Sequence, residues 1–341
     1  MTPPTPQGEF ALIRNSLTGL GAPRADVVTD VGDDCAITRV PPGLELAMSI
    51  DTLVSGIHFF PDCDPASLGH KSLAVGLSDL AAVGAEPAWA TLALTLPQAD
   101  ASWLNSFAEG LHQLACYHRL RLIGGDLTRG PLSISFQVMG FVAAGQGILR
   151  SGAKPGDAIL VSGHLGDAGL ALQQLLSAQS ASHSPITIDP RVRARLERPT
   201  PRVELGLNLR GLASAAIDIS DGLLADLGHL LEQSQCGADI ECKRLPLSDA
   251  VAAVVHQQDQ WSLPLSSGDD YELCFTVPRD KLAAVHEIAA AIACPVTVIG
   301  SITDQHGIRL LAEDGQPWHP DAQHAELTGF DHFRPSSSAS D

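Results

Sequence analysis

The sequence predicts a two-domain protein of the mixed α/β or α+β class. The chain has 341 residues, which is more than one hydrophobic core usually serves. Segments with the periodicity of strands alternate with helical segments in both halves, as in α/β and α+β folds. Hydrophobic residues make up 45% of the chain and charged residues 18%, a composition typical of globular proteins.

In the first half, helix and strand signals follow one another closely. Asp64 followed by Pro65 is typical of a helix start, because Asp caps the first turn and Pro fits the first helical position. Gly84 is expected to end that helix. We expect helices over residues 9–17, 64–84 and 102–117, and strands over 35–37, 44–50, 88–96, 120–123 and 132–142.

The strand expected over 44–50 alternates strictly between apolar and other residues. Its apolar row takes every second residue from Leu44 to Ile50. A period of two places Ser49 and Asp51 together on the opposite face. The same argument turns the side chain of Ile50 into the core.

The second half is organised around the stretch Ala216–Asp226. Strand character changes to helical spacing at Gly222, so Asp218, Ser220 and Asp221 lie where a strand meets a helix N-terminus. Such a position suits metal or phosphate binding, with simple helix capping as the alternative. We further expect strands over 158–162, 239–242, 271–277 and 296–302, helices over 248–257 and 281–292, and a surface loop over 177–190.

The formal net charge is −18, from 21 basic and 39 acidic residues. This charge argues against nucleic acid or an anionic membrane surface as a partner. An acidic protein still binds phosphates when divalent cations bridge the like charges.

The cysteine pattern indicates reduced thiols. The chain has 7 cysteines and no C-x-x-C pair, which is typical of a cytoplasmic protein and not of a disulfide framework. The first residues lack the pattern of a signal peptide, and no apolar stretch reaches the roughly 18 residues of a membrane span. We therefore expect a cytoplasmic protein without a membrane partner.

Acidic residues recur beside Gly or Ser near the ends of the expected strands. This set, with one member inside a helix, comprises Asp34, Asp51, Asp79, Asp126, Asp218 and Asp221. Carboxylates without Cys or paired His favour hard cations such as Mg²⁺. A turn explains any single Asp, so a magnesium site requires these residues to converge in space. No P-loop or protein-kinase catalytic loop is present, so a nucleotide would be held by metals and Gly-rich turns.

A series of short motifs resembles the thiamine-monophosphate kinases, a family of the aminoimidazole-ribotide-synthetase-like superfamily. In chain order they are Gly8-Glu9-Phe10, Gly32-Asp33-Asp34-Cys35-Ala36, Asp51-Thr52-Leu53, His58-Phe59, Leu77-Ser78-Asp79-Leu80-Ala81, Gly124-Gly125-Asp126, Arg150-Ser151-Gly152-Ala153, Asp218-Ile219-Ser220-Asp221-Gly222 and Gly268-Asp269-Asp270-Tyr271-Glu272-Leu273. Each motif alone is weak, but their order from residue 8 to Phe333 is specific.

The resemblance implies transfer of the γ-phosphoryl group of ATP to thiamine monophosphate, the last step of thiamine diphosphate synthesis. It implies several Mg²⁺ ions and no general base, because the acceptor phosphate is already mostly a dianion near neutral pH. It also implies an N-terminal domain (1–149) for ATP, metal and dimerisation, a C-terminal domain (150–334) and a disordered tail (335–341). The N-terminal strands would form a barrel across a homodimer, with the active site between the domains.

The resemblance assigns residues by position. The metal ligands would be Asp34, Ser49, Asp51, Asp79, Asp126, Asp218 and Asp221, with the backbone carbonyl of Ile50. ATP would contact Gly125, Asp126, Arg150 and Ser220. Thiamine monophosphate would contact His58, Asp269 and Phe330. Adenine contacts are not assigned: Tyr117 is a candidate, but a core aromatic residue is the preferred interpretation.

Three residues depart from the family pattern. Ile50 stands where the family often has Thr, so only its backbone can contact a metal. Asp269 replaces the common Glu and has a shorter reach. Phe330 replaces Tyr or Trp and keeps stacking without the polar group.

Other functions compatible with the residues are a superfamily enzyme acting on selenide or a formylglycinamidine, a metal-dependent phosphatase, and a non-catalytic Mg-nucleotide or thiamine-phosphate binding protein. The segment Met1–Gly8 has no Cys, which counts against the selenide enzyme. Paired-metal phosphatases commonly mix His with Asp, whereas these motifs are almost purely carboxylate.

Overall fold

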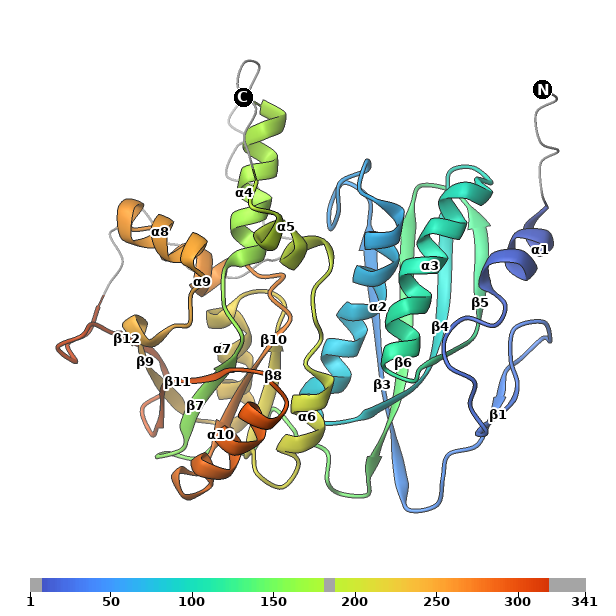
Figure 1. The fold of residues 1–341 in the computed structure, drawn as a ribbon. Helices are drawn as coiled ribbons and strands as arrows, with labels where there is room; N and C mark the ends of the chain where they lie inside the picture. Colours follow the sequence, from blue (N-terminus) through green and yellow to red (C-terminus); the bar gives the residue numbers. More distant parts are fainter. Residues whose placement is uncertain (1–7, 181–187, 319–341) are drawn as a thin grey trace. The chain divides into compact units, whose positions relative to one another are not determined.

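The computed structural model describes residues 8–180 and 188–318 (Figure 1). Phe330 and the tail 335–341 lie outside the described residues. The chain forms two compact units, one of Met1–Leu149 with Glu197–Leu212, the other of Arg150–Leu196 with Ala213–Asp341. The segment Glu197–Leu212 thus belongs to the first unit, although the expected boundary at residue 150 assigns it to the second domain.

The first unit is built from a four-stranded sheet and its covering helices. Its elements are α1 (Glu9–Leu12), the π-helical turn η1 (Ile13–Leu17), β1 (Val27–Thr29), β2 (Ile37–Thr38), β3 (Leu44–Val54), α2 (Pro65–Ala82), β4 (Glu86–Leu96), α3 (Ala101–Tyr117), β5 (Arg121–Arg129), β6 (Ser133–Ala143) and α6 (Val203–Leu209). Asp64 caps α2 as predicted, because its carboxylate accepts a hydrogen bond from the N–H of Ser67 at 2.8 Å.

The sheet of the first unit has the strand order β3-β6-β4-β5 and is open at both edges. Figure 1 shows α2 and α3 side by side over one face of this sheet. Leu73 and Leu77 of α2 are fully buried there. The strands of the described residues do not close into a barrel within one chain.

The opposite face of this sheet overturns one expectation. Leu44 and Leu46 pack against the buried cluster around Trp89, but Met48 is 59% and Ile50 66% exposed. The prediction that Ile50 points into the core is therefore wrong for the single chain. The alternation itself is right, but the buried face at this end of β3 is the one that carries Ser49 and Asp51.

Two smaller expectations also fail. The strand expected to end at Ile123 continues as β5 to Arg129, because its glycines still pair in register with β4. Tyr117 is 77% exposed at the end of α3 and stacks edge-on against His118, so it is not a core residue.

The second unit holds a six-stranded sheet with the order β12-β9-β11-β7-β10-β8. Its elements are β7 (Ala158–Ser162), α4 (Asp167–Ser180), α5 (Pro190–Glu197), β8 (Ala215–Ile219), α7 (Leu223–Ser234), β9 (Gly237–Glu241), η2 (Cys242–Arg244), α8 (Asp249–Gln258), α9 (Ser262–Ser266), β10 (Glu272–Val277), η3 (Arg279–Lys281), α10 (Leu282–Ala291), β11 (Val296–Thr303) and β12 (Gly307–Leu311). The strand-to-helix change predicted at Gly222 is confirmed. Part of the loop expected over 177–190 is helical, since α4 runs to Ser180.

Apolar residues of α7 form the core of the second unit together with the central strands. Leu223, Leu227 and Leu230 are fully buried and belong to one cluster with Ile217. Their spacing of three and four residues gives α7 one continuous apolar face. None of the described helices has the length and hydrophobicity needed to cross a membrane.

Two glycines set the separation between α2 and α3. A Cβ atom added at Gly69 would lie 2.0 Å from the carbonyl oxygen of Phe107, and one added at Gly110 would lie 1.8 Å from that of Ala66. The two backbones therefore touch at both positions, and any side chain there forces the helices apart.

We expect Gly69→Ala to lower the free energy of unfolding by about 2 kcal/mol or more, because the new methyl group overlaps backbone atoms. Urea denaturation measures the change. Gly228→Ala in α7 is the matched control, since a Cβ atom at Gly228 meets nothing within 4 Å. It should be neutral or stabilising by up to about 1 kcal/mol. Equal effects of the two variants would contradict the close-contact argument.

Candidate functional site

Ser49, Asp51 and Asp79 form the first group of predicted site residues. Ser49 and Asp51 lie on β3, on the face covered by α2. Asp79 lies in the last turn of α2, and one of its carboxylate oxygens accepts a short hydrogen bond from the hydroxyl group of Ser49. Strand alternation brings Ser49 and Asp51 to one face, as the sequence predicted, and the position of Asp79 on α2 adds a third oxygen-bearing side chain.

The surroundings of Asp51 in this group disfavour the negative charge of its carboxyl group. Burial raises its pKa to about 7, and the negative charge of Asp79 and a hydrogen bond with that carboxyl group add to the shift. Its Oδ2 atom is buried and has no hydrogen-bond partner among the described residues. A buried carboxylate oxygen without a donor, beside a second carboxylate, suits a divalent cation, because oxygen ligands are those that Mg²⁺ prefers.

The remaining predicted residues of the first unit lie elsewhere on it. Asp126 of β5 pairs with Ala93 of β4, whereas Asp51 lies in the adjacent row of paired residues across the sheet. Adjacent rows point to opposite faces of a sheet, so Asp126 is exposed on the face away from α2. Gly125 precedes it on this edge strand. Asp34 is exposed in the segment before β2, and its N–H donates to the carboxylate of Asp33 at 2.8 Å.

His58 is held in a tight turn that follows β3. The N–H of Val54 donates to Nδ1 of His58 at 2.9 Å. A backbone donor on Nδ1 places the proton of the neutral ring on Nε2. The neutral ring of His58 thus carries its N–H donor at Nε2, a kind of group that binds phosphate oxygens.

The second group of predicted residues surrounds the turn between β8 and α7. Asp226 determines the shape of this turn: its Oδ2 atom accepts hydrogen bonds from the N–H groups of Ser220, Asp221 and Gly222 at 3.0, 3.0 and 3.1 Å. Burial raises the pKa of Asp226 to about 7, and the charge of Asp221 adds to the shift although the three N–H groups oppose it. Asp218 is buried at the end of β8.

The segment Gly268–Tyr271 lies against this turn. The N–H of Asp269 donates to the carbonyl oxygen of Ser220, and the N–H of Tyr271 to that of Ile219, both at 2.8 Å. The loop that carries a predicted substrate contact is thus attached to the loop that carries predicted metal and ATP contacts.

The side chain of Ser234 holds the backbone around Arg150 in place. The hydroxyl group of Ser234 donates to the carbonyl oxygen of Arg150 at 2.8 Å and accepts from the N–H groups of Gly152 and Ala153 at 3.1 and 3.2 Å. The side chain of Arg150 is exposed, so its guanidinium group is accessible to a phosphate.

Several residues that shape these groups were missed from the sequence. These residues act through backbone groups or buried partners: Asp226, Ser234, Asp270 and Arg195. Asp270 belongs to a quoted motif, but no role was assigned to it. Only the role of Asp226 could have been predicted from the sequence, because a carboxylate in the first turn of a helix commonly accepts hydrogen bonds from preceding N–H groups.

The two groups belong to different units, Ser49, Asp51 and Asp79 to the first and Asp218, Ser220, Asp221 and Asp269 to the second. Across residues 8–180 and 188–318, no three His, Cys, Asp or Glu side chains are grouped closely enough to hold a metal ion. Taken by itself, neither unit groups three such side chains among its described residues.

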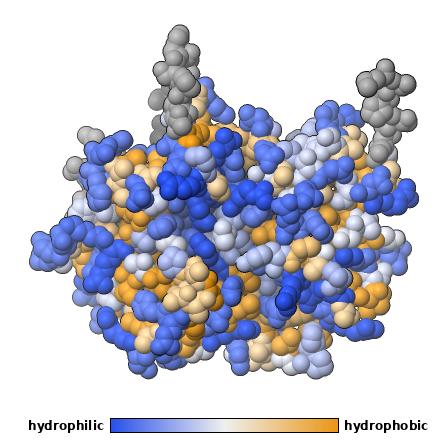
Figure 2. Space-filling view, viewed as in Figure 1, coloured by the Kyte–Doolittle hydropathy of each residue, from blue (hydrophilic) through white to orange (hydrophobic). Residues whose placement is uncertain are grey.

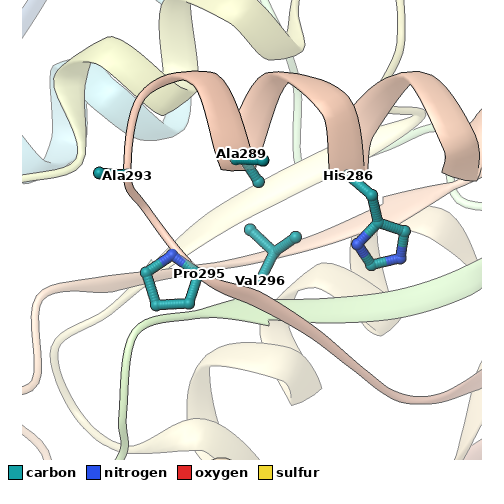
Figure 3. A pocket seen from close by; sticks show the side chains of 6 residues that line it. His286, Ala289, Ala293, Pro295 and Val296 are labelled. Carbon is teal, nitrogen blue, oxygen red and sulfur yellow. The ribbon is translucent and has the colours of Figure 1, made fainter.

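A groove of about 420 Å³ lies in the second unit, between α10 and the start of β11 (Figure 3). It is lined by Ala289, Ala290, Ala293, Pro295 and Val296, with His286 at one end. Figure 2 shows hydrophobic residues gathered over α10 on this face. No predicted site residue lines this groove, and it offers no convergent polar groups for a phosphorylated ligand.

Comparison with known proteins identifies the family. The sequence matches the family models AIR synthase related protein, N-terminal domain, over residues 32–142, and AIR synthase related protein, C-terminal domain, over residues 154–313. The thiamine-monophosphate kinase of Escherichia coli (strain K12) is 48% identical over 330 residues, 96% of this chain and 98% of the relative. The chain belongs to the thiamine-monophosphate kinase family. The resemblance seen in the motifs is thereby confirmed.

Solved structures of the family share this fold. The thiamine-monophosphate kinase from Stenotrophomonas maltophilia K279a is similar with a TM-score of 0.79 and 45% identity, covering 86% of this chain and 93% of that one. AaThiL complexed with AMPPCP and TMP is similar with a TM-score of 0.73 and 28% identity, covering 86% of this chain and 89% of that one. The expected pair of synthetase-like α/β domains is confirmed.

Asp226 predicts a pH dependence of stability. Its pKa is about 7 in the folded protein against an ordinary 3.8, so between these values the folded state binds more protons than the unfolded state. The contribution of Asp226 to stability therefore falls as the pH rises towards 7. We expect Asp226→Asn to abolish this pH dependence. Between pH 5 and pH 7 the free energy of unfolding of the wild type should therefore fall by about 1 to 3 kcal/mol more than that of the variant.

Urea denaturation of both proteins at the two pH values, without divalent cations, measures this difference. Asp280→Asn, at an exposed carboxylate, is the control and should follow the wild type. Parallel pH profiles of wild type and Asp226→Asn would show that Asp226 does not titrate in this range.

Proposed function

We propose that this protein phosphorylates thiamine monophosphate with ATP and produces thiamine diphosphate and ADP, the last step of thiamine diphosphate synthesis. The observation that carries the proposal is the 48% identity to a thiamine-monophosphate kinase across 96% of the chain. A structural relative bound to AMPPCP and TMP has the ligand pair that such a reaction needs.

The reaction does not need a general base. A phosphate monoester has a second pKa near 6, so the acceptor is mostly a dianion at neutral pH. The main obstacle is repulsion between two polyanions that must meet in line. We therefore assign no catalytic acid or base. The side chains of this protein are proposed to position the two substrates and to offset the negative charge of their phosphates.

We assign the magnesium ligands to Asp34, Ser49, Asp51, Asp79, Asp126, Asp218, Asp221 and the backbone carbonyl of Ile50. The support is the donor chemistry: oxygen atoms only, with the buried Oδ2 of Asp51 lacking a hydrogen-bond donor among the described residues. When bound, Mg²⁺ offsets the charge of the phosphate oxygens.

We assign ATP contacts to Gly125, Asp126, Arg150 and Ser220. The backbone of Arg150 is held by Ser234, which fixes the origin of a long side chain suited to phosphate oxygens. For thiamine monophosphate we assign His58 and Asp269, with Phe330 as a third contact that lies outside the described residues. The Nε2–H of His58 would donate to the phosphate, and Asp269 would accept from the aminopyrimidine.

We also propose that two copies associate through the open face of the sheet in the first unit, forming a barrel across a homodimer. Met48 and Ile50 expose large apolar side chains on this face, and β3 is a long edge strand. Exposed apolar patches beside an edge strand are typical of association surfaces. A cytoplasmic location fits the cysteines, all of which are free thiols.

Incubation of the purified protein with ATP, Mg²⁺ and thiamine monophosphate tests the function. We expect equal amounts of ADP and thiamine diphosphate by chromatography, and no product without a divalent cation. Release of inorganic phosphate in place of thiamine diphosphate would instead identify a phosphatase.

Asp51→Asn and Asp218→Asn should each lower kcat by roughly 100-fold or more, because each removes a charged metal ligand. Saturating Mg²⁺ should restore little of the rate. The exposed Asp280→Asn is the control, with a rate close to that of the wild type. A ligand assignment fails if its variant keeps normal kcat at saturating Mg²⁺ and has a wild-type circular dichroism spectrum.

Met48→Glu tests the dimer. We expect the dissociation constant of the dimer to rise by roughly 100-fold, because an unpaired carboxylate would be buried on the apolar face. Sedimentation velocity over a concentration series measures it. Leu172→Glu, at an exposed apolar residue of α4 in the second unit, should leave the dimer unchanged. A wild-type protein that sediments as a monomer would refute the proposal.

A further inference from the structure

The loop Gly268–Tyr271 has an unusual backbone. Gly268, Asp269 and Tyr271 have positive φ angles of 71°, 59° and 48°. Glycine adopts this left-handed region freely and Asp tolerates it, but it is rare for a bulky residue such as Tyr. A backbone of this kind persists only where surrounding contacts impose it, and such sites are often functional.

Contacts on every residue of the loop impose this conformation. The N–H groups of Asp269 and Tyr271 donate to the carbonyl oxygens of Ser220 and Ile219. A Cβ atom at Gly268 would lie 2.6 Å from the carbonyl oxygen of Ser220, so only glycine allows this close approach.

Asp270 anchors the loop from the other side. Its buried carboxylate accepts from the N–H of Gly166 at 3.0 and 3.1 Å. Its carbonyl oxygen accepts from the guanidinium group of Arg195 at 2.9 Å, and the same group donates to the fully buried carboxylate of Glu272 at 2.7 Å. The hydroxyl group of Ser162 also donates to Glu272, at 2.5 Å. Buried ionic groups fix the base of the loop.

Tyr271 connects this rigid base to one particular side chain. Tyr271 is only 4% exposed, and its hydroxyl group donates to Oδ1 of Asp269 at 2.9 Å. This bond restricts the rotation of the Asp269 carboxylate, which has further lone pairs for another donor. The stability of the fold does not require this hydrogen bond, because Asp269 is partly exposed and water can solvate its carboxylate.

We propose that Tyr271 is a positioning residue for substrate binding: its hydroxyl group holds the Asp269 carboxylate in the orientation that accepts from an amino-substituted heteroaromatic ring. This inference rests on the proposed function, in which Asp269 contacts thiamine monophosphate. Pre-orientation lowers the entropic cost of binding, so its loss weakens affinity for this substrate and spares the phosphoryl transfer itself.

Steady-state kinetics of four proteins test the proposal: wild type, Tyr271→Phe, Asp269→Asn and the double variant. Tyr271→Phe keeps the ring and removes only the hydroxyl group, and Asn tolerates the backbone of position 269. We expect Tyr271→Phe to raise KM for thiamine monophosphate roughly tenfold. The values of kcat and of KM for ATP should stay within about twofold of wild type. The double variant should be no worse than Asp269→Asn alone, because Tyr271 acts through Asp269.

Two further variants complete the experiment. Ser214→Ala removes a hydroxyl group that donates to the carboxylate of Asp157 at 2.6 Å in the same unit, so it should lower Tm without changing KM. Arg195→Lys loses the planar group that reaches both Asp270 and Glu272, so it is expected to raise KM for thiamine monophosphate. This variant keeps the test available if Tyr271→Phe does not fold.

The outcomes separate the two proposals. If Asp269→Asn raises KM for thiamine monophosphate but Tyr271→Phe does not, the positioning role is wrong and the proposed function stands. Additive effects in the double variant would also refute it, because they would show that Tyr271 acts independently of Asp269. If the wild-type protein forms no thiamine diphosphate, the proposed function itself fails.

Discussion

The carboxylate of Asp226 is the interaction on which the second unit's functional region depends. One oxygen atom accepts from three successive backbone N–H groups and thereby bends the chain between β8 and α7. The carbonyl oxygens of Ile219 and Ser220 then point to where the loop Gly268–Tyr271 attaches. Two segments that are distant in sequence acquire a common geometry because one buried carboxyl group satisfies a turn that would otherwise leave polar groups without partners.

Buried carboxylates in this protein fall into two kinds. Asp226, Asp270 and Glu272 each accept from N–H, O–H or guanidinium donors, so their burial is compensated within the unit. Asp51 differs from them because its buried Oδ2 atom accepts no hydrogen bond from the described residues, while Asp79 lies beside it. The first three carboxyl groups are explained by folding, whereas the surroundings of Asp51 are those expected of the magnesium ligand that we propose it to be.

Local periodicity predicted most elements of the fold, and motif order predicted the family. The alternation along β3 placed Ser49 with Asp51 correctly, yet it could not say which face α2 covers, so Ile50 was assigned to the wrong side. The continuation of β5 through Gly124 and Gly125 depends on pairing with β4, a non-local contact that propensity does not encode. Arg195 was missed, and Tyr271 was quoted only as part of a motif, for the same reason: their interactions exist only through partners brought together by folding.

The open sheet of the first unit has a consequence for the newly made chain. An eleven-residue edge strand, β3, with exposed Met48 and Ile50 is a template for pairing with any extended segment. In the proposed homodimer a second copy covers this face, so during synthesis the face would stay exposed until that copy arrives, and for longer as the protein becomes more dilute. Weakly expressed chains would therefore depend more heavily on holdase chaperones, and crowded ones would risk mispairing into aggregates.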